Sequence, residues 1–370
     1  MLMRAAACLV VAAGCSAADD RTPPASDALS ANGSIDSEPL ELPELLCALT
    51  GPPKTTSADT VVFGDEFDGA AVDNKKWSLI SGRRGSDNVL NSMAPTNAAV
   101  RAGSLVIASD RASSSDSTYP YRSALLDSLG KYARTYGRVE FRARFPFAAG
   151  VWFAMWGRAW FAAFPEIDVE ILNKGSVGHS QLYFVNHWAA PPIPADERRS
   201  FKMLEDVDLT EFHTYSVLWK PGLLEWAVDG VPKMQSKGRG VPTKPVYWMI
   251  NGFVGGWAGN PDATTRFPVT FEVDYMRVYR VDGLIADPEI NVANPSTKYS
   301  RKASVEVAVA NFDEACAHIE MYDGDTLVRT TSAAPYRFKL SRLTRGNHQL
   351  TFVATDGVRK TTTKLEAWVE

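Results

Sequence analysis

The sequence lacks the residues and motifs that several large classes of enzyme require. Only four cysteines and five histidines occur among its 370 residues, and no Cys/His spacing is typical of a zinc site. There is no Gly-x-Ser-x-Gly elbow, no His-Glu-x-x-His motif and no phosphate-binding loop. These absences argue against an α/β-hydrolase, a zinc protease and a P-loop nucleotide-binding enzyme.

The sequence also has no excess of positive charge, since 43 acidic residues outnumber 39 basic ones. A nucleic-acid partner requires a basic face, and we therefore expect none. Hydrophobic residues make up 45% and charged residues 22%, which is ordinary for a soluble globular protein. The ten tryptophans either fill the core or provide flat apolar platforms that suit sugar rings.

No apolar run is long enough to cross a bilayer, which takes about 20 residues. A short run at residues 5–13 follows Arg4, as in an export signal, and Ala12-Ala13-Gly14-Cys15 resembles the cleavage box of bacterial lipoproteins. Residues 1–15 are therefore predicted to be a signal peptide with lipid on Cys15. The alternative is plain secretion.

Export has consequences for the other cysteines and for location. Disulfides persist outside the cytosol, so Cys47 and Cys316 either pair or remain two separate buried thiols. Lipid on Cys15 would attach the protein to a membrane at the cell surface or outer membrane. We expect a monomer.

Residues 16–55 are rich in Ala, Ser, Pro, Asp and Glu, which predicts a disordered linker. Short alternating runs follow, and they are interrupted by Gly, Pro, Asn and Asp. In residues 137–144, for example, apolar and charged residues alternate with period two, as in a half-buried strand. Helical period is nearly absent, and only residues 195–199 are predicted to form a short helical turn. The fold class is therefore all-β.

The spacing of the runs predicts two β-sandwich domains, at residues 56–282 and 283–370. Asp323-Gly324-Asp325 is a signal for a tight hairpin in the second domain. The strands expected there span residues 303–310, 317–322, 326–330, 336–340, 348–355 and 361–369.

Glu166, Asp168 and Glu170 occupy alternate positions in one run, so a strand would point all three carboxylates to the same face. They could form the charged, solvated face of an amphipathic strand. Two observations favour an active site over a solvated face. The face carries no Lys or Arg that would relieve repulsion, and an aromatic-rich stretch at residues 152–164 precedes it.

Glycoside hydrolysis needs two carboxyl groups in opposite protonation states. Crowded carboxylates separate in pKa because like charges resist joint ionisation. Four steps along a strand cover ~13 Å, whereas a retaining pair of carboxyls lies ~5–5.5 Å apart. We therefore expect a curved sheet on which Glu166 and Glu170 lean together.

Several further runs occur in a characteristic order across residues 61–279. They are residues 65–69, 136–140, 145–146, 150–156, 166–170, 212–215, 228–230, 255–262 and 274–279. Together they resemble glycoside hydrolase family 16, the laminarinase and lichenase group. The resemblance implies a concanavalin-like β-jelly roll with a glycan cleft. It also implies a retaining mechanism with Glu166 as nucleophile, Glu170 as general acid/base and Asp168 assisting.

The same resemblance implies further site residues. Trp152 and Trp156 are candidate sugar platforms, and Trp257 is a candidate residue at the cleft rim. Core packing is the alternative for each of these tryptophans. His187 matches a cleft histidine, and a buried structural role is its alternative. Catalysis would need no cofactor. Family members often hold a structural Ca²⁺. The positions that match this calcium site are Glu66, Gly103 and Asp274, which would bind the ion mostly through backbone oxygens.

Some features depart from the laminarinase pattern. Laminarinases usually carry one extra residue between the aspartate and the second glutamate, whereas Asp168-Val169-Glu170 has none, as in lichenases. Residues 255–262 nevertheless resemble laminarinases. The substrate therefore stays open between β-1,3-glucan, mixed β-1,3/1,4-glucan and another glycan.

The remaining part of the chain, residues 283–370, resembles bacterial immunoglobulin-like modules, which usually act as spacers. The sequence predicts a retaining endo-β-glucanase. The alternatives are a glycan-binding protein without turnover and a transglycosylase.

Overall fold

The computed structural model describes most of the chain after residue 59. The described residues are 60–83, 88–113, 119–160, 164–190, 193–281, 283–284, 286–312, 318–332, 334–356 and 359–370. The predicted signal peptide, the lipid site Cys15, the linker at residues 16–55 and the cysteine pair Cys47 and Cys316 lie outside them.

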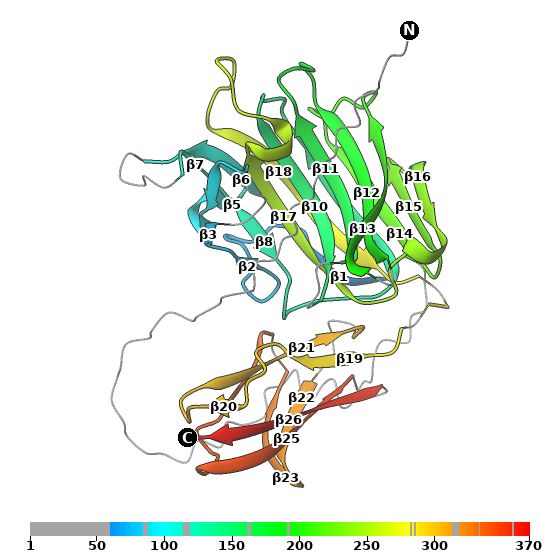
Figure 1. Ribbon diagram of the computed structural model, residues 1–370. Coiled ribbons are helices and arrows are strands. Elements are labelled where there is room, and N and C mark those ends of the chain that lie inside the picture. Colours follow the sequence, from blue (N-terminus) through cyan, green and yellow to red (C-terminus); the bar gives the residue numbers. More distant parts are fainter. Residues whose placement is uncertain are drawn as a thin grey trace.

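The all-β prediction is confirmed, since the helices among the described residues are three short 3₁₀ turns: η1 (Pro95–Asn97), η2 (Gly238–Gly240) and η3 (Gly256–Ala258). The larger sandwich packs two mainly antiparallel sheets face to face (Figure 1). The outer sheet runs in the order β16 (Val231–Lys237), β15 (Leu223–Val228), β14 (His213–Lys220), β9 (Gly137–Arg144), β18 (Val269–Tyr279), β6 (Ser104–Arg111), β7 (Tyr121–Ser123), β4 (Asn91–Met93) and β3 (Gly82–Arg83), with β1 (Val61–Asp65) on β18 and β5 (Ala98–Arg101) on β6.

The inner sheet has seven strands and carries the acidic run near its middle. Its order is β13 (Ile193–Leu204), β12 (Gln181–Ala190), β11 (Glu166–Asn173), β10 (Val151–Ala159), β17 (Val246–Val254), β8 (Leu125–Asp127) and β2 (Ser78–Leu79).

Alternation along each strand divides the inner sheet into two faces. Ile167, Val169 and Ile171 of β11 point into the main core between the sheets, where they are almost fully buried. Trp152 and Leu172 belong to a second cluster on the other face. We call this second face, which points away from the main core, the open face. Glu166, Asp168 and Glu170 lie on it because they alternate with the core residues.

The prediction of a helical turn at residues 195–199 is wrong. This segment lies within β13, which pairs with β12 from Leu182 to Ala190 and forms an edge of the inner sheet. Backbone pairing with β12 outweighs the weak local preference for helix, because tertiary context routinely overrides propensity.

The second sandwich contains a three-stranded and a five-stranded sheet. The first is β19 (Glu289–Val292), β21 (Ser304–Ala310) and β24 (Tyr336–Lys339); the second is β20 (Lys298–Tyr299), β26 (Lys360–Val369), β25 (Gly346–Thr355), β22 (His318–Asp323) and β23 (Thr326–Thr331). Each strand expected from residue 303 onward is found to within two residues. Asp323 pairs with Thr326, which confirms the tight hairpin, and Gly324 has the positive φ of 57° that such a turn needs.

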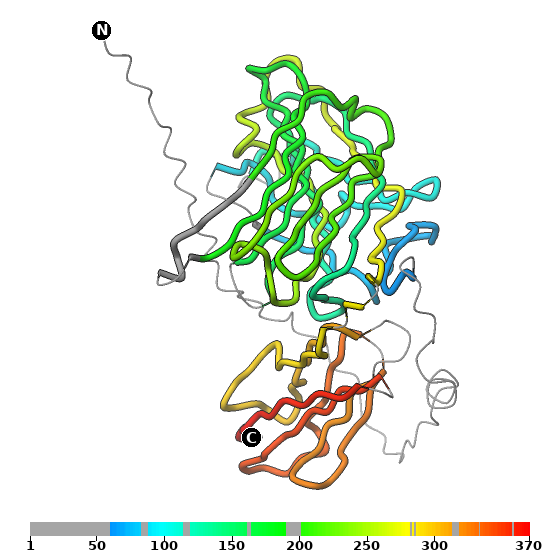
Figure 2. The backbone as a smooth tube through the Cα atoms, turned by 90° about the vertical axis from the view of Figure 1, so that its right-hand side faces the viewer, coloured from blue at the N-terminus to red at the C-terminus, as the bar shows by residue number. Residues whose placement is uncertain are grey.

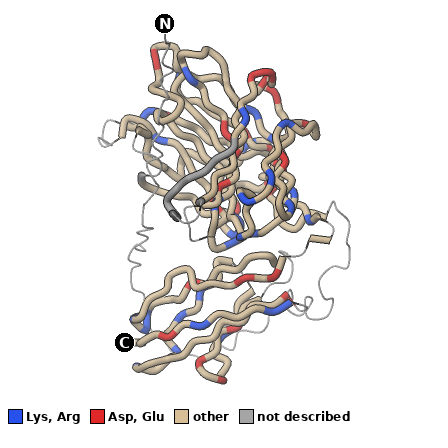
Figure 3. The backbone as a smooth tube through the Cα atoms, turned by 45° about the vertical axis from the view of Figure 1, so that its right-hand side comes forward, with Lys and Arg blue, Asp and Glu red and all other residues tan. Residues whose placement is uncertain are grey.

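The smaller sandwich lies below the larger one in the views of Figures 1 and 2. Asn311, which follows β21, is buried at the contact, where its Oδ1 accepts a hydrogen bond from the Thr135 amide at 2.7 Å. The backbone N–H of Asn311 donates to the Ala133 carbonyl oxygen at 3.1 Å. Acidic and basic residues are interspersed along both sandwiches (Figure 3). The described part of the chain contains no helix with the length and apolarity that a membrane crossing requires.

Candidate active site

The acidic run forms the first half of β11, between β10 and β12 in the inner sheet (Figure 1). Its register with both neighbours is continuous, so the strand has no bulge between Asp168 and Glu170. Residues that face each other across an antiparallel pair share a face of the sheet. The partners on β10 and β12 are Arg158 and His187 for Glu166, Trp156 and Val185 for Asp168, and Ala154 and Tyr183 for Glu170.

The three carboxylates differ in their access to solvent. Glu166 is partly exposed, whereas Asp168 is only 1% exposed and Glu170 only 7%. Burial of a carboxylate is costly unless polar or charged groups compensate it. A merely solvated strand face would not bury two carboxylates in this way, so the arrangement favours a chemical role.

His187 on β12 completes a compact cluster with two of these acids. One oxygen of Glu166, one of Asp168 and a ring nitrogen of His187 all lie within 4.8 Å of one another. The Asp168 Oδ2 is 3.5 Å from the His187 Nε2, at the long end of hydrogen-bonding distance. The Phe164 ring stacks near the imidazole, with centroids 6.4 Å apart. The structure thus brings the predicted cleft histidine next to the acidic strand.

The backbone of Asp168 also accepts a hydrogen bond from the outer sheet. Trp226 on β15 of the outer sheet reaches through the core, and its Nε1 donates to the Asp168 carbonyl oxygen at 3.0 Å. The indole is fully buried. Sequence reasoning missed this contact because 58 residues separate the two positions and no local pattern marks it.

Trp156 lies beside Asp168 and is partly exposed on the open face. Its Nε1 donates to the Oδ1 of Asn251 on β17 at 2.7 Å, which fixes the orientation of the indole ring. Asn251 is fully buried, and Ala154 separates it from the Glu170 position in the sheet. Trp156 therefore has a fixed ring orientation and some exposed surface, and its role as a sugar platform stays a prediction.

Trp152 and Trp257 belong to one aromatic stack. Trp152 packs on Phe253 and on Trp257, with ring centroids 4.5 Å and 5.5 Å apart. Trp152 is buried, whereas Trp257 in η3 is 40% exposed. Trp257 thus presents the accessible ring surface, and Trp152 supports it from below.

Register identifies two further residues that the sequence did not single out. Arg158 is the cross-strand neighbour of Glu166, and Tyr183 is that of Glu170. The Tyr183 hydroxyl donates to the Gln181 Oε1 at 3.1 Å. Alternation places each residue on a face, but only the pairing of strands reveals which residues are neighbours.

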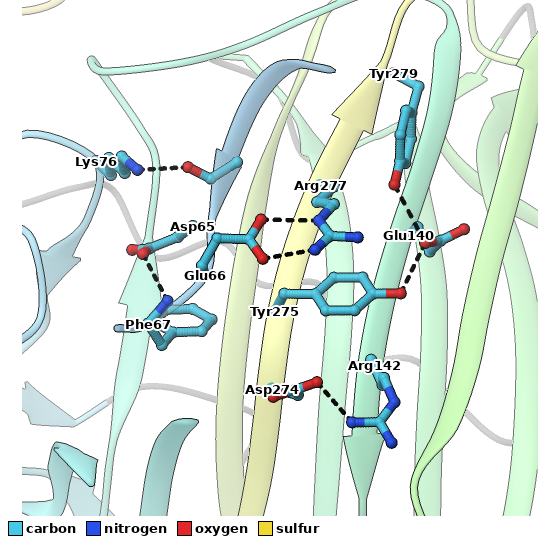
Figure 4. Close-up of polar contacts among 11 residues, drawn as sticks. Asp65, Glu66, Phe67, Lys76, Glu140, Arg142, Asp274, Tyr275, Arg277 and Tyr279 are labelled. Carbon is cyan, nitrogen blue, oxygen red and sulfur yellow. Dashed lines mark hydrogen bonds and ion pairs between the residues drawn. The ribbon is translucent and has the colours of Figure 1, made fainter. Parts of the chain in front are cut away.

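The positions matched to calcium lie on the outer sheet. Glu66 receives two hydrogen bonds from Arg277, at 2.8 Å and 2.6 Å, and Asp274 receives one from Arg142 at 2.6 Å (Figure 4). Gly103 lies in the turn between β5 and β6 with a φ of 76°. Arginines thus engage both carboxylates, which leaves backbone oxygens as the donors for an ion. The calcium site stays a prediction.

The pairing with Arg277 changes the acidity of Glu66. Hydrogen bonds from the guanidinium stabilise the carboxylate and lower the pKa of Glu66, while partial burial acts in the opposite direction.

The chain is similar to known proteins in sequence and in fold. Residues 86–277 match the model of the Glycosyl hydrolases family 16. Glucan endo-1,3-beta-glucosidase A1 of Niallia circulans is 28% identical over 60% of this chain, which spans only 38% of that relative. Beta-glucanase of Rhodothermus marinus is 29% identical, and the match covers 63% of this chain and 90% of the relative.

Among solved structures, the endo-beta-1,3-glucanase from Pyrococcus furiosus is similar to this chain, with a TM-score of 0.53 and 27% sequence identity. The match covers 60% of this chain and 95% of that one. Because the family model spans more than half of the sequence, the chain belongs to glycosyl hydrolase family 16.

Proposed function

We propose that this protein is a retaining endo-β-glucanase that hydrolyses β-1,3-glucan, mixed β-1,3/1,4-glucan or both. The observation that carries the proposal is the open-face cluster of Glu166, Asp168 and His187, with Glu170 on the same strand, in a family 16 chain. The curated relatives named above are a glucan endo-1,3-beta-glucosidase and a beta-glucanase, which supports β-glucan as the substrate. The bulge-free spacing of Asp168 and Glu170 keeps mixed-linkage glucan in the proposal.

The reaction would proceed in two displacements. Glu166, the more exposed acid, attacks the anomeric carbon while Glu170 gives its proton to the leaving glycosidic oxygen. Glu170, now a carboxylate, then removes a proton from water, and the resulting hydroxyl displaces Glu166 from the sugar. Asp168 lies between the two and contacts His187, so we assign it the role of orienting Glu166.

Burial supports this division of roles. Glu166 is more exposed than Glu170, which is 7% exposed, so the sugar can reach the proposed nucleophile directly. The aromatic ring of Trp156 beside Asp168 would stack on the sugar at the reacting centre.

The test is the release of reducing sugar from laminarin, lichenan, xyloglucan and agarose by the wild type and by Glu166→Gln. Laminarin or lichenan should be cleaved by the wild type and not by the variant. Activity that survives in Glu166→Gln would overturn the assignment of the nucleophile. Binding of glucan without any turnover by the wild type would instead make the protein a glycan-binding module.

Product analysis separates hydrolysis from transglycosylation, since both use the same glycosyl-enzyme. The wild type is incubated with laminarin in the presence and absence of a labelled acceptor oligosaccharide. Hydrolysis predicts unlabelled products of decreasing length. Labelled products longer than the acceptor would identify a transglycosylase.

We further propose that the chain is exported and carries lipid on Cys15, and that residues 283–370 form an immunoglobulin-like spacer. The signal-like run at residues 5–13 and the cleavage box support the first part, and the two-sheet sandwich after residue 283 supports the second. Metabolic labelling with palmitate should mark the wild type but not Cys15→Ser. Label in the Cys15→Ser variant would contradict lipidation at this residue.

A further inference from the structure

Two apolar side chains stand out on the edge strand β13, next to the proposed active site. We propose that Phe201 and Met203, here called the β13 strip, bind a sugar unit of the glucan chain on the far side of the acidic strand from Trp156. This inference rests on the proposed function, because it assigns a part of the same substrate. No resemblance or comparison described above places a substrate contact on β13.

Strand register puts the β13 strip on the open face. Phe201 pairs with Val185 on β12, Val185 pairs with Asp168, and Asp168 pairs with Trp156 on β10. Directly paired residues of antiparallel strands point to the same side. Phe201, Asp168 and Trp156 therefore belong to one row that crosses the sheet. Met203 occupies the next row through Tyr183, which faces Glu170.

The spacing of the row suits an extended glucan. Neighbouring strands lie about 4.8 Å apart, so Phe201 is about 10 Å from the Asp168 position. This distance is comparable with the length of a disaccharide. A glucan that lies across the strands over Trp156 and the acidic strand would therefore reach Phe201 at its other end.

The exposure of the β13 strip agrees with a binding role. Phe201 is 57% exposed and Met203 is 39% exposed, so both offer apolar surface on the face that carries the buried carboxylates. The flat apolar side of a pyranose ring stacks well on such a surface. Lys202 between them points to the opposite face, and its Nζ donates to the Lys233 carbonyl oxygen of β16 at 2.8 Å. Lys202 therefore lies on the face opposite the β13 strip.

The test measures kcat/KM of the full chain on β-glucan oligosaccharides of increasing length. In the wild type, kcat/KM should rise once the oligosaccharide is long enough to reach Phe201. Phe201→Ala should remove this rise, about a tenfold loss on long substrates, and leave short ones unchanged. Phe201→Tyr, which keeps the ring, should behave like the wild type. Lys202→Ala is the matched control on the opposite face of the same strand and should keep the rise.

End-labelled oligosaccharides give an independent readout, because loss of a binding position at one end shifts the point of cleavage. A shifted product pattern in both Phe201→Ala and Met203→Ser supports the inference. Equal loss on all lengths, or no change in either variant, would overturn it while the proposed function stands. A wild type that cleaves no β-glucan would overturn both.

Discussion

The two sheets of the larger sandwich use acidic residues in opposite ways. On the outer sheet, four acids are paired with arginines. The pairs are Glu66 with Arg277, Asp274 with Arg142, Glu272 with Arg144 and Glu140 with Arg138 (Figure 4 shows the first two). On the inner sheet, β11 carries three acids and no basic residue, and its acids Asp168 and Glu170 are buried. The cross-strand neighbours of these two acids are uncharged, and only the partly exposed Glu166 has an arginine, Arg158, opposite it.

The two groups of acids therefore suit different roles, ion pairing on the outer sheet and the proposed chemistry on the inner sheet. Partly exposed ion pairs contribute little to stability and are tolerant of change. Buried, clustered carboxylates are destabilising by themselves, and proteins keep them where a function requires perturbed acidity. Sequence alternation looks alike in β9 and β11, but only β11 lacks the arginines.

The largest expected effect contrasts the nucleophile with an acid of the outer sheet. Glu166→Gln should reduce kcat on laminarin or lichenan by about 10⁴-fold or more, because the amide cannot form the glycosyl-enzyme. Glu272→Gln removes an acid that is paired with Arg144 on the outer sheet, and it should leave kcat within about twofold. Equal losses in the two variants would mean that the two sheets do not differ as described.

A second contrast concerns the acid/base role of Glu170. Glu170→Gln should lower kcat by about 10²–10⁴-fold on glucan. An activated aryl β-glycoside, whose leaving group needs no proton, should form the glycosyl-enzyme at a rate close to the wild type, as a burst of released phenol would show. If the burst slows as much as glucan hydrolysis does, Glu170 is not the general acid.

The positions and faces of the strands could be predicted from the sequence, but the neighbours of the acidic residues across the sheet could not. The alternation of residues 137–144 and 166–170 was sufficient to place β9 and β11 and to assign their faces, since period two is a local property. The segment at residues 195–199 was misassigned because its conformation depends on pairing with β12. The positions of His187, Arg158 and Phe201 relative to the acids likewise follow from register between strands, which no local pattern encodes.

A smaller effect tests whether the outer sheet supports the acidic strand through Trp226. Trp226→Phe removes the indole donor to the Asp168 carbonyl, and a hydrogen bond of this kind contributes about 0.5–1.5 kcal/mol. Both the melting temperature and kcat should fall, with kcat about tenfold lower because Asp168 shifts.

Trp219→Phe provides the matched control for Trp226. Trp219 is also a buried tryptophan of the outer sheet, and its Nε1 donates to the Pro242 carbonyl at 2.9 Å, away from β11. This variant should lose stability without losing kcat. A kcat loss of the same size in both variants would assign Trp226 a purely structural role.

The smallest effect concerns the pair of Glu66 and Arg277. Arg277 lowers the pKa of Glu66 in the folded protein, so the unfolded chain binds more protons as the pH falls through the acid range. The pair therefore stabilises the fold at neutral pH, and this contribution disappears as the pH falls through the lowered pKa.

The Glu66 side chain is 50% exposed, so solvent screens the pair and its contribution is less than about 1 kcal/mol. Urea unfolding of the wild type and Glu66→Gln should differ by this amount at pH 7 and converge in strong acid. A difference that grows as the pH falls would reverse the sign of the linkage. Glucanase activity at pH 7 should be the same in both proteins, because the carboxylate of Glu66 is paired with Arg277 on the outer sheet, away from the proposed active site.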